Sequence, residues 1–272
     1  KAAEVLAFAA ANKAAVDSSP AIASVVADAA TAAGRLDEAE ALLRQVLAQA
    51  PRHAPTLSKL SLLLLRRDAL DEAQSVSRRL LDEQPDLFMA RHNLAFALLK
   101  LGRFSEAEAQ ARQVLAQQPA YARSTYTLGL ALLSQGRFEE GLEAFEARLD
   151  PVNAGNNSPP APVSYPHWRG EPLDGKSILI WIEQGLGDEI MMARYAAVLK
   201  ARGASLVSLF CRQALEPLFK SLPGVDAVYP TAGSISLPQH DYWVYPMSLP
   251  RLCGARSDAT AWSGAYLTPS DE

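Results

Sequence analysis

The sequence predicts an all-α solenoid of helical repeats, followed by an α/β domain of the Rossmann-like type. A proline and a small residue recur at one fixed interval through positions 1–150, which is typical of stacked helical repeats. The last part of the chain instead alternates short apolar runs with helical patterns, which favours a parallel sheet. We therefore expect a solenoid at 1–150, a linker at 151–170 and the α/β domain at 171–272.

The composition is that of an ordinary soluble protein and argues against several functions. Of 272 residues, 49% are hydrophobic and 21% charged, and the net charge of −4 is spread evenly over both parts. Without a basic patch we expect no nucleic-acid partner, and no apolar run approaches the length of a membrane span. Cys211 and Cys253 lack metal-ligand spacing, the four histidines form no metal motif, and two thiols are typical of a cytoplasmic protein. The chain begins at Lys1 rather than Met, so the natural start is left open.

The repeat is defined by three sets of positions that share the same spacing. A small residue lets two helices approach closely, and a proline cannot continue the helix before it, so it ends the unit. Because one unit cannot bury its apolar face alone, stacking is required. Full units are expected at 20–53, 54–87 and 88–121, a fourth at 122 to about 150, and 1–19 resembles the second helix of an earlier, truncated unit. The three sets are Pro51, Pro85 and Pro119; Gly34, Asp68, Gly102 and Gly136; and Ala39, Ala73, Ala107 and Gly141.

A unit of two helices that repeats at the spacing of Pro51, Pro85 and Pro119 resembles the tetratricopeptide repeat. The resemblance implies a concave surface, lined by the first helix of each pair, that receives a protein or peptide partner. Side chains on that surface could instead pack on neighbouring repeats, and for the leucines at Leu62, Leu65, Leu99, Leu130 and Leu133 packing is favoured. The predicted partner-binding groove comprises Met89, His92, Asn93, Phe96, Arg123 and Tyr126.

The α/β part begins after a connector rich in proline, asparagine and glycine. The apolar run 177–182 reads as a strand buried on both faces, followed by a helix that continues to 202. Further strands are expected at 205–211, 225–229 and 241–245, with a helix at 213–222. Strands that alternate with helices imply parallel pairing and right-handed crossovers.

The turn at 183–188 is the first place to look for chemistry, because open α/β sheets bind ligands at the carboxyl ends of their strands. Gly185 and Gly187 are expected to permit a sharp turn and a close approach of a ligand. A dinucleotide site is disfavoured, because Ile190 stands where the third glycine of that fingerprint belongs. Arg212 ends the second strand region, where an acidic ribose-binding residue would be needed.

Several segments carry a resemblance that spans the chain. They are Trp168-Arg169-Gly170, Pro172-Leu173-Asp174-Gly175-Lys176, Glu183-Gln184-Gly185-Leu186-Gly187-Asp188 and Arg194-Tyr195. With the repeats, they are similar to bacterial proteins that join tetratricopeptide repeats to a glycosyltransferase domain of the heptosyltransferase type. The resemblance implies the GT-B architecture of two Rossmann-like domains. The residues after the repeats suffice for one of them, so we expect the acceptor-side half alone.

The resemblance also implies roles at the turn. Asp188 would be the catalytic general base, and an ordinary helix N-cap is its alternative role. Glu183, Gln184, Gly185 and Gly187 would line the acceptor cleft, and for Glu183 and Gln184 structural roles are equally open. We expect no cofactor, and a nucleotide sugar as donor substrate only with the missing half. Some relatives line the groove with asparagines at the sixth position of each unit, and Asn93 alone fits here.

Two classes of function follow. The first is a glycosyltransferase that selects a protein acceptor, flagellin-like in related enzymes, through its repeats; this chain would then be an inactive part of it. The alternative is a non-catalytic adaptor in which the α/β part is a scaffold. A polysaccharide-assembly enzyme that docks through its repeats is a third reading.

Overall fold

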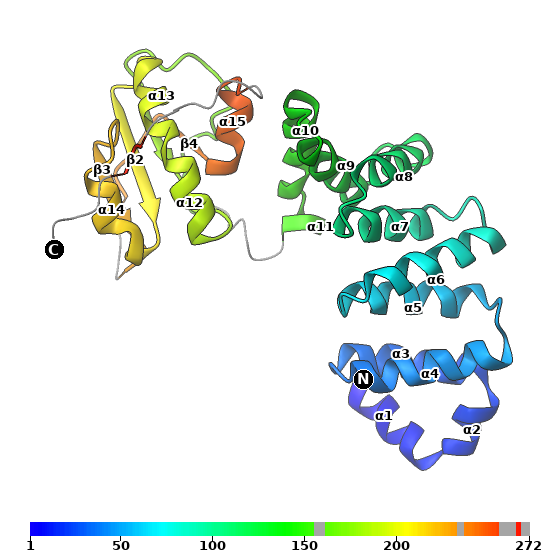
Figure 1. Ribbon diagram of the computed structural model, residues 1–272. Coiled ribbons are helices and arrows are strands. Elements are labelled where there is room, and N and C mark those ends of the chain that lie inside the picture. Colours follow the sequence, from blue (N-terminus) through cyan, green and yellow to red (C-terminus); the bar gives the residue numbers. More distant parts are fainter. Residues whose placement is uncertain (155–160, 233–236, 256–264, 268–272) are drawn as a thin grey trace. The chain divides into compact units, whose positions relative to one another are not determined.

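The computed structural model describes residues 1–154, 161–232, 237–255 and 265–267 (Figure 1). It contains two compact units, 1–131 and 132–272, which divide within helix α9.

The first unit consists of helices that pack in successive pairs. Helices α3, α5, α7 and α9 begin at equal intervals along the chain, and each of the first three is followed by a partner, α4, α6 or α8 (Figure 1). The predicted repeat is therefore confirmed in register. The bounds are α1 Ala2–Ala11, α2 Lys13–Ser18, α3 Pro20–Ala32, α4 Leu36–Gln49, α5 Ala54–Arg66, α6 Leu70–Glu83, α7 Phe88–Lys100, α8 Phe104–Gln117 and α9 Ala122–Ser134.

The small residues at the twentieth position of each unit lie where two helices approach closely. Ala39, Ala73 and Ala107 are fully buried. In the repeat that begins at Ala122 the equivalent residue is Gly141. A Cβ there would lie 2.9 Å from the backbone nitrogen of Leu133. Contact at this distance leaves no room for a methyl group, which explains the glycine.

The turn between the two helices of each repeat requires a left-handed residue. Gly34, Gly102 and Gly136 have φ of 76°, 75° and 76°, and Asp68 takes the same position with φ 60°. A Cβ at Gly102 would meet nothing within 4 Å, so the preference for glycine here is conformational and does not come from steric crowding.

We expect Asp68→Gly to raise the free energy of unfolding by roughly 0.5–1 kcal/mol, because it relieves the left-handed strain of a residue with a Cβ. The carboxylate of Asp68 also pairs with Lys100, but the pair is exposed and offsets only a few tenths of that gain. Urea unfolding followed by far-ultraviolet circular dichroism measures the change. Lys100→Gln isolates the ion pair, and Gly102→Asp should produce the opposite shift; a stabilising Gly102→Asp would refute the explanation.

The second unit holds a four-stranded sheet with only parallel pairs, in the order β3-β2-β1-β4. The central strand β1 pairs with β2 and β4 through Ile178, which lies opposite Val207 and Tyr242. The elements are α10 Phe138–Phe145, η1 Glu146–Leu149, α11 Pro151–Ala154, β1 Ser177–Ile180, α12 Leu186–Ala193, α13 Tyr195–Ala201, β2 Leu206–Cys211, η2 Gln213–Leu215, α14 Glu216–Lys220, β3 Ala227–Pro230, β4 Tyr242–Val244, η3 Pro246–Ser248 and α15 Leu249–Leu252.

The two faces of this sheet differ in what covers them. One face presents Ile178, Ile180 and Val207 to a core shared with the helices that follow the strands. The other face is aromatic, with Trp181 stacked on Phe210 at a centroid distance of 4.1 Å, and it packs against residues such as Tyr165 and Leu237. Both faces are thus covered, as a parallel sheet requires.

The predicted strands are all present, but the helices are shorter than expected. The region 186–202 is divided at Arg194, which ends α12 and precedes α13. The region 213–222 starts as a 3₁₀ turn, and α14 follows with Pro217 in its first turn. Because proline lacks a backbone N–H, it is accommodated at the start of a helix and not further along.

Candidate functional site

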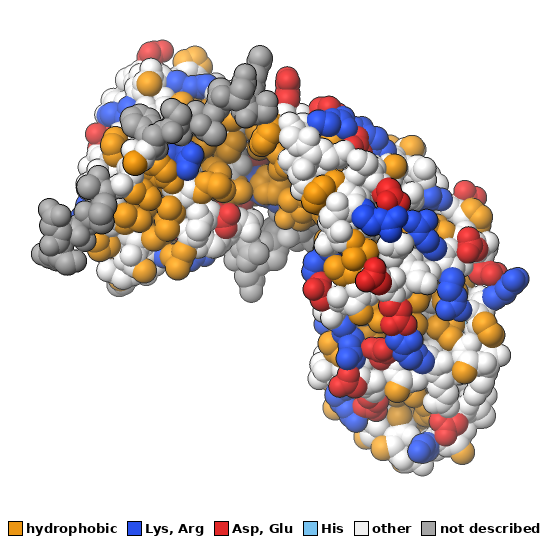
Figure 2. Space-filling view, in the orientation of Figure 1, with side chains coloured by type: hydrophobic (Ala, Val, Ile, Leu, Met, Phe, Trp, Pro, Cys, Tyr) orange, Lys and Arg blue, Asp and Glu red, His pale blue; other side chains and the backbone are white. Residues whose placement is uncertain are grey.

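The surface formed by the first helices carries the predicted groove residues at different depths. Met89 is 48% exposed and Arg123 is exposed as well, so both are accessible to a partner. Phe96 is half-buried against the repeat core, and Tyr126 is half-buried as well. Figure 2 shows hydrophobic side chains exposed among charged ones on the helical repeats.

His92 and Asn93 bridge neighbouring repeats. The Nδ1 atom of His92 lies 2.9 Å from the hydroxyl of Ser124, and its ring meets Tyr121 edge to face. The amide of Asn93 donates to the hydroxyl of Ser61 at 3.3 Å. Both side chains therefore have the packing role that the sequence left open, and their part in partner binding stays a prediction.

We expect His92 to make the repeats sensitive to acid. Burial, and secondarily the charge of Arg123, lowers the pKa of His92 from 6.5 to about 4. The unfolded chain then binds a proton at higher pH than the folded one, so stability is complete above pH 6.5 and falls as the pH drops toward 4. The loss is on the order of 3 kcal/mol. Urea midpoints between pH 7 and pH 4 measure it, and the slope should be shallower in His92→Gln; equal slopes would contradict the assignment.

An exposed apolar row on the first helices was only partly predicted. Val25 in α3, Leu62 in α5 and Met89 in α7 are 54%, 52% and 48% exposed. They occupy the sixth, ninth and second positions of their units, which share one face of a helix. The prediction that the leucines pack holds for Leu65 and Leu99, which are buried, but is wrong for Leu62. The ninth position of the unit, which Leu62 occupies, could have indicated exposure on the first-helix surface. The general tendency of leucine to be buried in cores favoured packing instead.

In the second unit, the turn after β1 differs from the expected glycine turn. The left-handed residue is Gln184, with φ 60°, whereas Gly185 is extended with φ −103° and ψ 174°. Gly187 lies in the first turn of α12, and a Cβ there would meet nothing within 4 Å. The predicted need for two flexible glycines at the turn is therefore corrected: the backbone reverses at Gln184.

Asp188 is the third residue of α12 and not its N-cap, which is Gly185. Its carboxylate reaches back to accept the backbone N–H of Gly185 at 3.0 Å. This is one half of a capping box, since glycine has no side chain to return the bond. The residue is half-buried beside the turn and keeps part of its surface exposed.

Arg212, at the end of β2, holds the turn in place. Its guanidinium donates to the carboxylate of Glu189 and to the backbone carbonyl of Gln184. Burial raises the pKa of Glu189, while hydrogen bonds and charge from Arg212 oppose that rise. The pair thus braces the left-handed Gln184 from the neighbouring strand, a role that the spacing along the chain did not reveal.

Glu183 lies beneath this turn and has no exposed side chain. Arg148 from η1 donates to it, with Nε 2.7 Å from Oε1, and the N–H of Met247 donates to Oε2 at 3.2 Å. Arg148 is itself 2% exposed and also donates to the hydroxyl of Ser248. This position gives Glu183 the structural role that the sequence left open, in place of a lining of the acceptor cleft.

The arrangement leaves one carboxylate for chemistry at the end of β1. Asp188 is half-buried but partly exposed, and a carboxylate in hydrogen-bond reach of a hydroxyl can accept its proton. Among the described residues, no three His, Cys, Asp or Glu side chains are grouped to hold a metal ion. In the same residues, no helix has the length and apolar character needed to cross a membrane.

Comparisons with known proteins define the class of the repeats. Family models of the tetratricopeptide repeat match residues 30–90 and 92–154. The helical pairs of this chain are therefore tetratricopeptide repeats, and repeats of this class generally bind protein partners.

Particular proteins match a part of the chain. Protein FlbA of Caulobacter vibrioides is 38% identical over 90 residues, which are 32% of this chain and 15% of FlbA. The chain thus spans a small part of that relative. Among solved structures, MamA from Desulfovibrio magneticus RS-1 is 25% identical with a TM-score of 0.45, covering 48% of this chain and 74% of MamA. MamA AMB-1 is 26% identical with a TM-score of 0.45, covering 47% and 76%.

Proposed function

We propose that this chain binds a protein segment on the surface formed by the first helices of its repeats. The observation that supports this proposal is the exposed apolar row of Val25, Leu62 and Met89, one residue from each of three successive first helices. Large apolar side chains on one face of neighbouring helices suit the apolar side of a partner's helix or extended segment. Arg123 adds a cation at the same surface.

The test uses the full chain as bait in a lysate of the source cell. Met89→Asp should remove the specific partner, because it places a charge in the apolar row. Met191→Asp is a matched control, since Met191 is 41% exposed but belongs to α12 in the second unit. Far-ultraviolet circular dichroism should show both variants folded. Loss of the partner with both variants, or with neither, would contradict the assignment of this surface.

A second candidate is that the α/β part is the acceptor-side half of a GT-B glycosyltransferase and that the repeats select its protein acceptor. The parallel sheet, with Leu186-Gly187-Asp188 directly after the turn that follows its central strand, supports this candidate. Asp188 would act as the general base, and the nucleotide sugar would bind to a half not contained in this chain. A cytoplasmic location and a flagellin-like acceptor belong to the same candidate.

Asp188→Asn in the complete protein separates catalysis from capping. An asparagine oxygen can still accept the N–H of Gly185, so stability should change little. If Asp188 is the base, sugar-sized mass additions on the captured partner should disappear while the partner remains bound. Unchanged additions, or a partner that never carries them, would favour the non-catalytic adaptor.

A further inference from the structure

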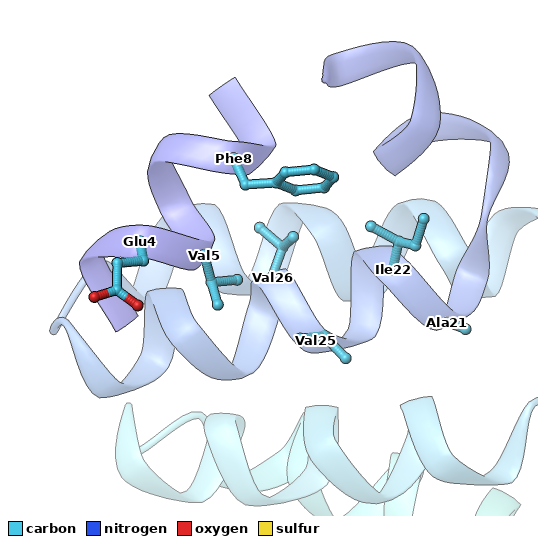
Figure 3. Close-up of a pocket in the computed structure, with 7 residues that line it drawn as sticks. All are labelled: Glu4, Val5, Phe8, Ala21, Ile22, Val25 and Val26. Atoms are coloured by element: carbon cyan, nitrogen blue, oxygen red, sulfur yellow. The ribbon is translucent and has the colours of Figure 1, made fainter. Parts of the chain in front are cut away.

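The apolar cavity between α1 and α3 lacks the polar groups that would orient a ligand. It measures about 560 Å³, and the ring of Phe8 lies above the side chains of Ile22 and Val26 (Figure 3). Apart from Glu4, its lining is apolar. Because a few well-placed polar groups fix the orientation of a ligand in its site, the carboxyl edge of the sheet in the second unit, where such groups gather, is the stronger candidate.

The strand order places the expected ligand crevice between β1 and β4. The chain runs from β1 through β2 to β3 and then returns to the other side of β1 as β4. In open α/β sheets, ligands bind outside the carboxyl ends of the strands at the point where the order reverses in this way. Glu183 follows β1 and Ser248 follows β4, so these two residues border that point, and both are fully buried.

The guanidinium group of Arg148 fills this crevice. Its Nε and Nη2 atoms donate to the two carboxylate oxygens of Glu183 at 2.7 and 3.2 Å, and Nη2 also donates to the hydroxyl of Ser248 at 2.8 Å. Its Nη1 atom donates to the carboxylate of Glu146 at 2.6 Å, and its Cζ atom lies 4.8 Å from the ring centroid of Phe145. A carboxylate bound through two N–H groups, further acceptors and an aromatic face are the features that recognise a guanidinium.

The groups around the guanidinium are also held by bonds that do not involve Arg148. The hydroxyl of Ser248 donates to the carboxylate of Glu146 at 3.0 Å, and the backbone N–H of Met247 donates to that of Glu183 at 3.2 Å. Removal of the Arg148 side chain would therefore leave a shaped space with an unbalanced buried negative charge. Such a space favours a cation over a neutral molecule of the same shape.

We propose that the crevice between β1 and β4 is a guanidinium-binding site and that the chain's own Arg148 is its ligand. The site goes beyond partner binding by the repeats and does not depend on it. With Arg148 in place the crevice is closed. A ligand at the carboxyl edge of the sheet would then approach on the β2 side of β1, where Arg212 contacts Gln184.

The test removes the side chain and supplies its atoms as a small molecule. In the full chain with Arg148→Gly, about 10 mM n-propylguanidinium should raise the thermal midpoint, followed by tryptophan fluorescence, by roughly 3–5 °C and in a saturable manner. Neutral n-propylurea has nearly the same shape and should raise it by less than about 1 °C. If the variant is unfolded alone, n-propylguanidinium should restore the folded fluorescence. A response no larger than that to n-propylurea would overturn the proposal.

Two control variants locate the effect in the crevice. Arg148→Gly combined with Glu183→Gln removes the buried charge, so n-propylguanidinium should shift the midpoint no more than n-propylurea does. Arg251→Gly is the matched control, because Arg251 also pairs with Glu146 but its side chain is 31% exposed. Its midpoint should shift by less than about 1 °C. A shift in either control equal to that of Arg148→Gly would overturn the proposal, because the cation would then act elsewhere.

Discussion

Replacing Arg148 by Met should lower the free energy of unfolding of the second unit by about 3–5 kcal/mol. Arg148 and Glu183 are 2% and 0% exposed, and their charged groups meet at 2.7 Å. Without the guanidinium, Glu183 would remain as a buried carboxylate beside the N–H of Met247, a neutral donor that cannot balance its charge. The hydroxyl of Ser248, which also bonds Glu146, would lose a donor as well.

The measurement is urea unfolding followed by tryptophan fluorescence. All four tryptophans follow residue 132, so the signal reports the second unit. The double variant Arg148→Met with Glu183→Gln should recover a large part of the loss, because the amide carries no charge and still accepts the N–H of Met247. If the double variant is as unstable as the single one, the unpaired charge is not the cause.

Gly224→Ala should be the other strongly destabilising change, at roughly 2–4 kcal/mol, from left-handed strain of about 1 kcal/mol added to overpacking of about 1–3 kcal/mol. A Cβ at Gly224 would lie 2.6 Å from both Cα and N of Ala197 in α13, and backbone atoms cannot move aside as a flexible side chain can. The residue also has φ 87°, which L residues rarely adopt. The left-handed strain and the overpacking therefore both arise from the same added methyl group.

Gly175→Ala separates these two causes. Gly175 has φ 70° in the same unit, but a Cβ there would meet nothing within 4 Å. The free energy of unfolding of Gly175→Ala should fall by only about 1 kcal/mol, which is the cost of the left-handed backbone without overpacking. Fluorescence-detected unfolding of the two variants gives the difference. Similar losses in both would mean that the contact with Ala197 relaxes at little cost.

The repeat architecture could be predicted because its signals are local and recur. A helix pair of fixed length needs a small residue at each close approach, a left-handed residue at each turn and a helix-ending proline, so the repeat spacing is visible in the sequence itself. The strand order of the sheet was not predicted, but the strands and their parallel direction were, because a buried strand is a short apolar run. Helix ends were less accurate, as at Arg194, where no local signal marks the break.

The candidate sites depended more on contacts between distant segments. The sequence predicted chemistry at the turn of Glu183, Gly185 and Asp188, from the apolar run before it, and this stays a prediction. It could not show that Arg148 neutralises Glu183 from a distant part of the chain, or that Arg212 braces Gln184. Nor could it separate exposed Leu62 from buried Leu65, because both fit an apolar helix face. The sequence alone determined which elements form, since each element depends on residues a few positions apart. Only the tertiary structure decided which polar and apolar side chains remain accessible, because burial depends on what other segments cover.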